Sequence, residues 1–200
     1  MNTRQIIRNS LLAGSLLLAA PAAFADAKEI AETVCIACHG EGGNSVVPTF
    51  PKLAGQHPVY MEKQLLEFLD GKRKNEAMEP FLGNFTRNDV PALAAYYAAQ
   101  QQTPGEVSNP ELLAAGKALY EDGNVDSGVP GCMGCHQANG QGNARYPRLA
   151  GQHQAYTLQQ MSDFKSGVRT NDRGKLMRAV AERMTEQEMQ AVSEYIAGLK

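Results

Sequence analysis

The chain contains an internal duplication, and this feature constrains its fold more than any other. The segment FPKLAGQH at residues 50–57 matches YPRLAGQH at residues 146–153. The offset between these segments is 96 residues, and it rises to 99 residues between Thr86 and Thr185. A repeat of this length has the size of a small domain and is far longer than the ~20–45 residues of a solenoid unit. The sequence therefore predicts two homologous domains in tandem.

The boundary between the two copies is predicted to lie in a polar linker. Residues 100–105, QQQTPG, end in turn-forming residues, as expected of a linker between domains. The segment NPE at residues 109–111 then has the cap, first-turn proline and acid of a helix start. We therefore place the N-terminal domain at residues 26–105 and the C-terminal domain at residues 106–200. The second copy carries extra residues at about 121–131, which we interpret as a surface loop.

Both copies are predicted to be helical, since no stretch has the alternation of a strand. A middle helix is expected from about residue 59 to residue 69, ending at Gly71, with a counterpart in the second copy. The last helix of each copy is expected to begin at Thr86 or Thr185, where the sequence is close to a capping box. Pro91 would then lie well inside its helix, where a bend is expected.

Each copy contains the motif Cys-x-x-Cys-His, at residues 35–39 and 132–136. In this motif the two thiols add to the vinyl groups of a haem and the adjacent imidazole coordinates its iron, so one helical turn serves one porphyrin. A thioredoxin-like pair needs a βαβ pattern, which is absent, and a zinc site does not explain the histidine after both motifs. We therefore predict two covalently attached c-type haems. The predicted attachment residues are Cys35, Cys38, Cys132 and Cys135, and the predicted iron ligands are His39 and His136.

The duplication also selects a second axial ligand from eight methionines. Methionine is more often core filler than ligand, but a functional ligand is expected to recur in both copies. Met78 and Met177 recur, because each lies eight residues before its capping threonine, Thr86 or Thr185. We therefore assign Met78 and Met177 as axial ligands. The segment that precedes Met177 is three residues longer than its counterpart before Met78.

His57 and His153 also recur and are the rival axial ligands. A bis-histidine centre would have a lower potential than a His/Met centre. Both lie beside turn elements before the middle helix, and we interpret them as hydrogen-bonding within their loop or lying near a propionate. A ligating histidine usually donates its other N–H to a fixed acceptor, and the carbonyls of Pro51 and Pro147 are the predicted acceptors. Further recurring residues that are candidates to contact propionates or the domain interface are Tyr60, Gln64 and Arg73.

Residues 1–25 are predicted to be a cleavable export signal. Arg4 and Arg8 precede an apolar stretch at residues 11–20, and the sequence AFA ends at Ala25. The apolar stretch is shorter than the roughly 20 residues that a spanning helix needs. We therefore expect cleavage after Ala25 and a periplasmic location.

With these motifs the chain resembles the dihaem cytochrome c4 family, which has two class I cytochrome c domains in tandem. The resemblance covers essentially the whole expected mature chain, including Arg-x-Asn at Arg73 and Arg169 and the Met–Thr–Tyr pattern that ends each copy. It implies an all-α fold in which each domain surrounds one covalent haem with His/Met ligation, the haems facing each other across an interface. It also implies an electron carrier, loosely membrane-associated in some members, between respiratory-chain donors such as a quinol-oxidising complex and a terminal oxidase or other reductase.

Two saturated irons favour a one-electron carrier over an enzyme, because no position is left for a substrate. A dihaem peroxidase is the enzyme alternative, but that class normally needs a longer chain and a haem with an openable site. A haem sensor or a subunit of a larger complex is the third alternative, and the sequence shows no signalling domain. With a net charge of −2, the chain lacks the basic stripe of a nucleic-acid-binding protein.

Overall fold

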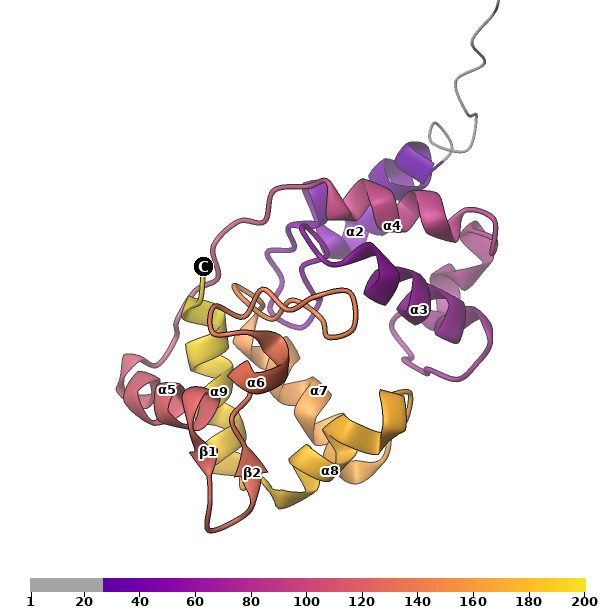
Figure 1. The fold of residues 1–200 in the computed structure, drawn as a ribbon. Coiled ribbons are helices and arrows are strands. Elements are labelled where there is room, and N and C mark those ends of the chain that lie inside the picture. Colours follow the sequence, from indigo (N-terminus) through magenta and orange to yellow (C-terminus); the bar gives the residue numbers. More distant parts are fainter. Residues whose placement is uncertain (1–26) are drawn as a thin grey trace, which may run out of the picture.

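The structure, a computed structural model, describes residues 27–200. The predicted export signal and its cleavage site after Ala25 lie outside the described residues. The described chain forms two helical units that are joined by an extended segment (Figure 1). The loops of residues 40–57 and 137–153 meet between the two units, and hydrogen bonds cross from one loop to the other. No helix within residues 27–200 combines the length and apolar character needed to cross a membrane.

The N-terminal unit is built on a helical segment that runs from residue 27 through the first Cys-x-x-Cys-His motif. Helices α3 and α4 pack together over an apolar core that includes Met61, Leu93 and Tyr97. The elements of this unit, in order, are η1 (Ala31–Cys35), α2 (Ile36–His39), η2 (Glu41–Gly43), α3 (Pro58–Leu69), η3 (Glu79–Asn84) and α4 (Val90–Ala98).

The C-terminal unit has its own apolar core, centred on Tyr120, Met184 and Val192. Helices α5 and α9 cross closely at Gly116, where any Cβ atom would collide with the backbone of Ala191. The elements of this unit, in order, are η4 (Pro110–Leu112), α5 (Leu113–Glu121), β1 (Gly123–Asn124), β2 (Val129–Pro130), α6 (Met133–His136), α7 (Gln154–Ser166), η5 (Arg173–Lys175), α8 (Leu176–Arg183) and α9 (Glu186–Gly198).

The helix boundaries follow from local chemistry and confirm most of the predicted ones. Asn109 caps the start of η4 by accepting a hydrogen bond from the backbone of Glu111. Helix α3 begins with Pro58 at its first position, where the missing N–H costs nothing. Thr185 and Glu188 form a complete capping box at the start of α9. The all-α class and the middle helices are therefore confirmed.

The predicted bend at Pro91 is wrong. Helix α4 begins at Val90, so Pro91 occupies its second position, where the backbone N–H would have no partner inside the helix. The segment before it is a turn rather than a helix, and Thr86 donates from both its N–H and its hydroxyl to the Asp89 carboxylate at 2.7 Å. The threonine therefore closes a turn that leads into the helix.

The extra residues at about 121–131 contain a small hairpin rather than a plain surface loop. Strands β1 and β2 pair antiparallel, with Gly123 opposite Pro130 and Asn124 opposite Val129. Val129 is buried in the C-terminal core, so this stretch also packs against the domain. The prediction of a chain without strands is wrong at this one place, because two-residue strands are too short to show alternation.

The duplication extends further towards the N-terminus than the sequence motifs reveal. Lys28 pairs with Glu32, four residues further along the helix, at 3.7 Å. Lys117 pairs in the same way with Glu121, four residues further along α5. The hydroxyl of Tyr96 donates to Glu32 at 3.4 Å, and its counterpart in α9 makes the same contact with Glu121. The extra residues of the second copy therefore all follow Glu121.

Candidate haem sites

The first Cys-x-x-Cys-His motif forms the end of the N-terminal helical segment. Cys35 ends η1, and Cys38 and His39 lie in α2, so the two thiols and the imidazole project from about one helical turn. Burial raises the pKa of the Cys35 thiol. Gly40 then turns the chain with a left-handed φ of 72°, and a Cβ atom there would lie 2.6 Å from the carbonyl oxygen of Asn44. The first copy therefore requires glycine at this turn.

The imidazole of His39 is oriented by the backbone of Pro51. Its Nδ1 lies 2.9 Å from the Pro51 carbonyl oxygen. A carbonyl can only accept a hydrogen bond, so Nδ1 carries the proton and Nε2 carries the lone pair. Burial lowers the pKa of His39, which keeps the ring neutral. The predicted acceptor is confirmed, and the ring is in the protonation state that binds a metal ion.

The second motif repeats this arrangement. Cys132 precedes α6, and Cys135 and His136 lie inside that helix. The Nδ1 of His136 donates to the Pro147 carbonyl oxygen at 3.0 Å, and burial lowers the pKa of this histidine as well. Burial raises the pKa of Cys132 to about 11. The two copies therefore present the same set of two thiols and one neutral imidazole.

The predicted methionine ligands lie in two different local structures. Met78 directly precedes η3, and it packs with Cys35 against the N-terminal core. Met177 is half-buried in the first turn of α8. Among the described residues, the C-terminal core cluster includes Cys132 but not Met177. The structure thus brings Met78 and Cys35 into one apolar cluster and does not do the same for Met177 and Cys132.

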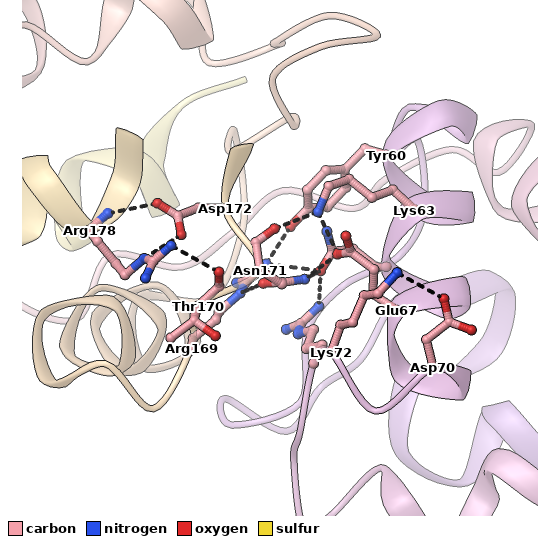
Figure 2. A network of polar contacts seen from close by, with 12 residues as sticks. Tyr60, Lys63, Glu67, Asp70, Lys72, Arg169, Thr170, Asn171, Asp172 and Arg178 are labelled. Atoms are coloured by element: carbon pink, nitrogen blue, oxygen red, sulfur yellow. Dashed lines mark hydrogen bonds and ion pairs between the residues drawn. The ribbon is translucent and has the colours of Figure 1, made fainter. Parts of the chain in front are cut away.

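The three additional residues before Met177 form η5. Asp172, on one side of η5, is hydrogen-bonded to Arg178 on the other side. The Asp172 carboxylate accepts from the backbone N–H of Arg178 at 3.1 Å and from its Nε at 2.7 Å. The same guanidinium donates to the Thr170 carbonyl at 3.1 Å (Figure 2). In the first copy a shorter connection suffices, because the Met78 N–H donates to the Asn75 side chain at 3.1 Å. Asp172 follows Asn171 as Glu76 follows Asn75, but its contact with Arg178 spans the three inserted residues, so the repeat alone does not reveal it.

The rings of His57 and His153 do not hydrogen-bond within their own loops, so the prediction of local hydrogen bonds is wrong. The Nε2 of His57 hydrogen-bonds to the carbonyl oxygen of Gln141 at 2.8 Å, in the other unit. The Nε2 of His153 hydrogen-bonds to the carbonyl oxygen of Ser45 at 2.9 Å, again across the interface. In each of these histidines, Nε2 is therefore engaged with a backbone carbonyl of the other unit.

Arg169 lies at the centre of a polar network between the units. Its guanidinium donates to Gln160 of its own unit at 2.9 Å and to the Tyr60 hydroxyl and Gln64 of the other unit, both at 3.0 Å. Figure 2 shows this network from close by, with Tyr60 and Arg169 meeting between the two sets of helices. The matching hydrogen bonds from Arg73 run to Gln64, Tyr156 and Gln160.

This network holds two cations with no anionic partner. Among residues 27–200, neither Arg73 nor Arg169 forms an ion pair, and every side chain that they hydrogen-bond is neutral. Arg169 is only 8% exposed. Burial opposes ionisation of Tyr60, but the charges of Arg169 and Arg73 outweigh it and hold the pKa of Tyr60 below its usual value. A buried cation is costly unless it is paired, so this interface fits an anionic group such as a haem propionate.

A further observation fits a prosthetic group beside the first motif. The hydroxyl of Tyr97 is buried and has no hydrogen-bond partner among the described residues. Burial near the Cys35 thiol raises the pKa of Tyr97. In the second copy the position of Tyr97 is taken by Ile196, and the Tyr120 hydroxyl instead donates to the Gln137 carbonyl at 2.7 Å. The thiols, neutral imidazoles and unpaired cations together suit a covalently attached haem.

Comparisons with known proteins agree with this geometry. The family model described as Cytochrome c matches residues 24–100 and 113–200. A cytochrome c4 of Thiocapsa roseopersicina is 49% identical over 172 residues, covering 84% of this chain and 88% of that protein. A protein of Thiomonas intermedia named thiosulfate dehydrogenase electron acceptor is 37% identical, covering 92% of this chain and 86% of its own length.

The solved structures lead to the same family. The crystal structure of reduced recombinant cytochrome c4 from Pseudomonas stutzeri superposes with a TM-score of 0.83 at 40% identity, covering 89% of this chain and 98% of that one. The likeness thus extends over both domains and their arrangement. The chain therefore belongs to the cytochrome c4 family, and it is an electron-transfer cytochrome with two tandem cytochrome c domains of the kind that attach c-type haem covalently.

Proposed function

We propose that the chain carries two haems with His/Met ligation and shuttles single electrons between redox proteins. Haem 1 is attached by Cys35 and Cys38 and takes His39 and Met78 as axial ligands. The residues proposed for haem 2 are Cys132, Cys135, His136 and Met177. The observation that carries this proposal is the pair of Nδ1 hydrogen bonds to proline carbonyls, 2.9 Å and 3.0 Å long, which leave Nε2 of each histidine available to a metal.

The proposed residues explain why the protein is a carrier rather than an enzyme. Haem supplies a centre that takes up and releases one electron. His39 and His136 would fill one axial position of each iron, and Met78 and Met177 would fill the other, so no position remains for a substrate. Thioether ligation would also keep both potentials higher than bis-histidine ligation. Arg73 and Arg169 would neutralise propionates at the domain interface.

The export signal at residues 1–25 supports a periplasmic location after cleavage following Ala25. We place the boundary between the two domains at residue 105, in the extended linker. A quinol-oxidising respiratory complex is the proposed donor, and a terminal oxidase or other reductase is the proposed acceptor. The name of the Thiomonas intermedia relative supports a thiosulfate-oxidising dehydrogenase as a second kind of donor.

The test is to produce the chain in a host that attaches haem c and to analyse the purified protein. We expect two haems that remain bound after denaturation, uptake of two electrons, and the charge-transfer band at the red end of the visible spectrum that reports an Fe–Met bond. Met78→Ala and Met177→Ala should each remove part of that band. A protein with one haem, with no such band, or with rapid peroxide turnover would contradict the proposal.

A further inference from the structure

Two glutamines, Gln56 and Gln152, reach across the interface and pair with backbone of the opposite domain. The Gln152 side chain accepts from the Lys52 N–H at 2.9 Å and donates to the Lys52 carbonyl at 2.9 Å. The Gln56 side chain accepts from the Arg148 N–H at 2.9 Å and donates to the Arg148 carbonyl at 3.0 Å. Each amide therefore satisfies both backbone groups of one residue in the other domain.

These contacts are buried and fixed. Gln56 and Gln152 are 9% and 8% exposed, and Lys52 is 6% exposed. The oxygen of Gln152 also accepts from the His153 N–H at 3.0 Å, and the oxygen of Gln56 accepts in the same way from the residue that follows it. The amide orientation is set by this geometry, because an oxygen must face the two N–H donors and a nitrogen must face the carbonyl.

The paired backbone is the one that orients the haem histidines. The N–H of Lys52 and the C=O of Pro51 belong to the same peptide group. That carbonyl accepts from Nδ1 of His39 at 2.9 Å, while the N–H donates to Gln152. One peptide group thus joins a glutamine of the C-terminal domain to the histidine of the N-terminal domain. The reciprocal chain runs from Gln56 through the Pro147–Arg148 peptide group to His136.

A peptide group transmits polarisation from one end to the other. Its C–N bond has partial double-bond character, so a hydrogen bond accepted from the N–H increases the negative charge on the carbonyl oxygen. Chains of hydrogen bonds strengthen one another by roughly 10–30% per bond in condensed phase. A stronger acceptor at Pro51 raises the basicity of the His39 imidazole, because it draws the Nδ1 proton away from the ring.

We propose that each glutamine is a positioning residue for the histidine ligand of the haem in the opposite domain: Gln152 for His39 and Gln56 for His136. The inference rests on the proposed haem ligation. A more basic imidazole favours the ferric state, so each glutamine lowers the potential of the haem across the interface. The potential of each haem therefore depends on a side chain that the opposite domain supplies across the interface.

The test uses Gln152→Met, which keeps the length of the side chain and removes both hydrogen bonds with Lys52 as well as the local one from the His153 N–H. Resolved potentiometric titration should show a positive shift for haem 1 and an unchanged potential for haem 2. The reciprocal variant Gln56→Met should raise the potential of haem 2 alone. The haems are told apart by Met78→Ala and Met177→Ala, each of which alters one of the two signals. The Nδ1 proton resonance of His39 in the reduced protein should move in Gln152→Met and stay in place in Gln56→Met.

A matched control is available at the same interface. Gln102 donates to the Ala150 carbonyl at 2.9 Å and accepts from the Arg148 side chain, without touching either peptide group that orients a histidine. Gln102→Met should leave both potentials unchanged. Gln152→Glu retains an acceptor oxygen for the Lys52 N–H, so it should not raise the potential of haem 1. This variant provides the alternative test if Gln152→Met does not fold.

Three outcomes would overturn the inference. The first is a Gln152→Met protein in which neither haem shifts, and the second is one in which both shift equally, as general loosening of the interface would produce. The third is a rise of the haem 1 potential in Gln152→Glu. Failure of the proposed function is seen separately, in a wild-type protein that lacks two haems or the Fe–Met charge-transfer band.

Discussion

The carboxylate of Asp172 accepts two hydrogen bonds from Arg178, one from the backbone N–H at 3.1 Å and one from Nε at 2.7 Å. The Asp172 side chain is 3% exposed, so this is a nearly buried interaction. Arg178 directly follows Met177, the proposed ligand of haem 2, in the first turn of α8. The hydrogen bond therefore fixes the part of the helix that carries the proposed sulfur ligand, across the three residues that the first copy lacks.

Replacing this carboxylate should loosen one haem ligand and not the other. In Asp172→Ala we expect imidazole to displace Met177 at lower concentration than in the wild type, with the Fe–Met band falling by at most the haem 2 contribution. The loss of a buried charged acceptor should also cost about 1–3 kcal/mol of stability. Imidazole titration followed at the Fe–Met band measures the first effect. Asn75→Ala is the matched variant for the Met78 ligand of haem 1. If either variant made both methionine ligands equally easy to displace, this prediction would be contradicted.

The positive charge of the buried Arg169 at the interface should raise the potentials of both haems. Arg169→Gln removes one positive charge, which disfavours the more negative ferrous state, so both potentials should fall by an amount on the order of 1 kcal/mol in equivalent energy. The same change should raise the pKa of Tyr60, because the Arg169 charge helps to hold it low. Potentiometry and an ultraviolet titration of tyrosinate measure the two effects.

Arg87 provides the charge-matched control for that experiment. It pairs with Asp70 on the surface, with its side chain 60% exposed. Exposed charges are screened by solvent and salt, so Arg87→Gln should leave the potentials nearly unchanged. If Arg87→Gln lowered them as much as Arg169→Gln, burial of the interface charge would not be the cause.

Much of the site could be predicted because residues with a shared role recur at equivalent positions in the two copies. The two Cys-x-x-Cys-His motifs, the carbonyls of Pro51 and Pro147 and the middle helices all follow from patterns that recur with a fixed chemistry. Pro91 was misjudged because the threonine before it closes a turn and not a helix. The hairpin was missed because strands of two residues carry no periodic signal.

The interface could not be predicted, since contacts between the two copies leave no local pattern. Gln56 and His57 are visible as repeated residues, but the sequence offers no partner for Gln56 and predicts for His57 a local hydrogen bond or a nearby propionate. Their partners lie 92 and 84 residues away along the chain. Only the three-dimensional arrangement shows that each repeated pair binds the loop of the other copy. The role of Asp172 could not be predicted for a different reason: its partner Arg178 lies beyond the three inserted residues, where the repeat gives no guide.

Stability should fall as the pH is lowered through the range in which His153 is protonated in the unfolded chain. Burial lowers the pKa of His153 below its ordinary 6.5, and the nearby Lys52 charge acts in the same direction, against the Ser45 carbonyl and Glu106. The unfolded chain therefore binds a proton where the folded protein does not, and the free energy of unfolding decreases as the pH falls below 6.5. Denaturant unfolding between about pH 7 and pH 5 measures this slope.

The variant His153→Gln separates this histidine from the others. Gln does not titrate, and its amide can still donate towards the Ser45 carbonyl, which accepts at 2.9 Å in the wild type. The pH dependence of unfolding should therefore become shallower in the variant, while the stability at about pH 7 changes less. An unchanged slope would show that the acid sensitivity arises elsewhere.

Gln137 holds the same backbone conformation after the second motif that Gly40 holds after the first. Its φ is 66°, against 72° at Gly40. With ψ at 158°, this is a backbone region that glycine alone enters readily, and it costs a residue with a Cβ atom roughly 1–3 kcal/mol. Gln137→Gly should therefore stabilise the protein by about 0.5–1 kcal/mol, after the greater freedom of glycine in the unfolded chain is subtracted.

The carbonyl of Gln137 accepts from Tyr120 through the main chain, so the substitution leaves that hydrogen bond in place. Tyr120→Phe removes it and should destabilise the protein by about 0.5–1.5 kcal/mol, because the buried tyrosine loses its hydrogen bond while the Gln137 carbonyl keeps the one from the Gly140 N–H. Denaturant unfolding of the two variants and the double variant checks both signs. If Gln137→Gly were destabilising, the Gln137 side chain would have to contribute more than its backbone strain costs.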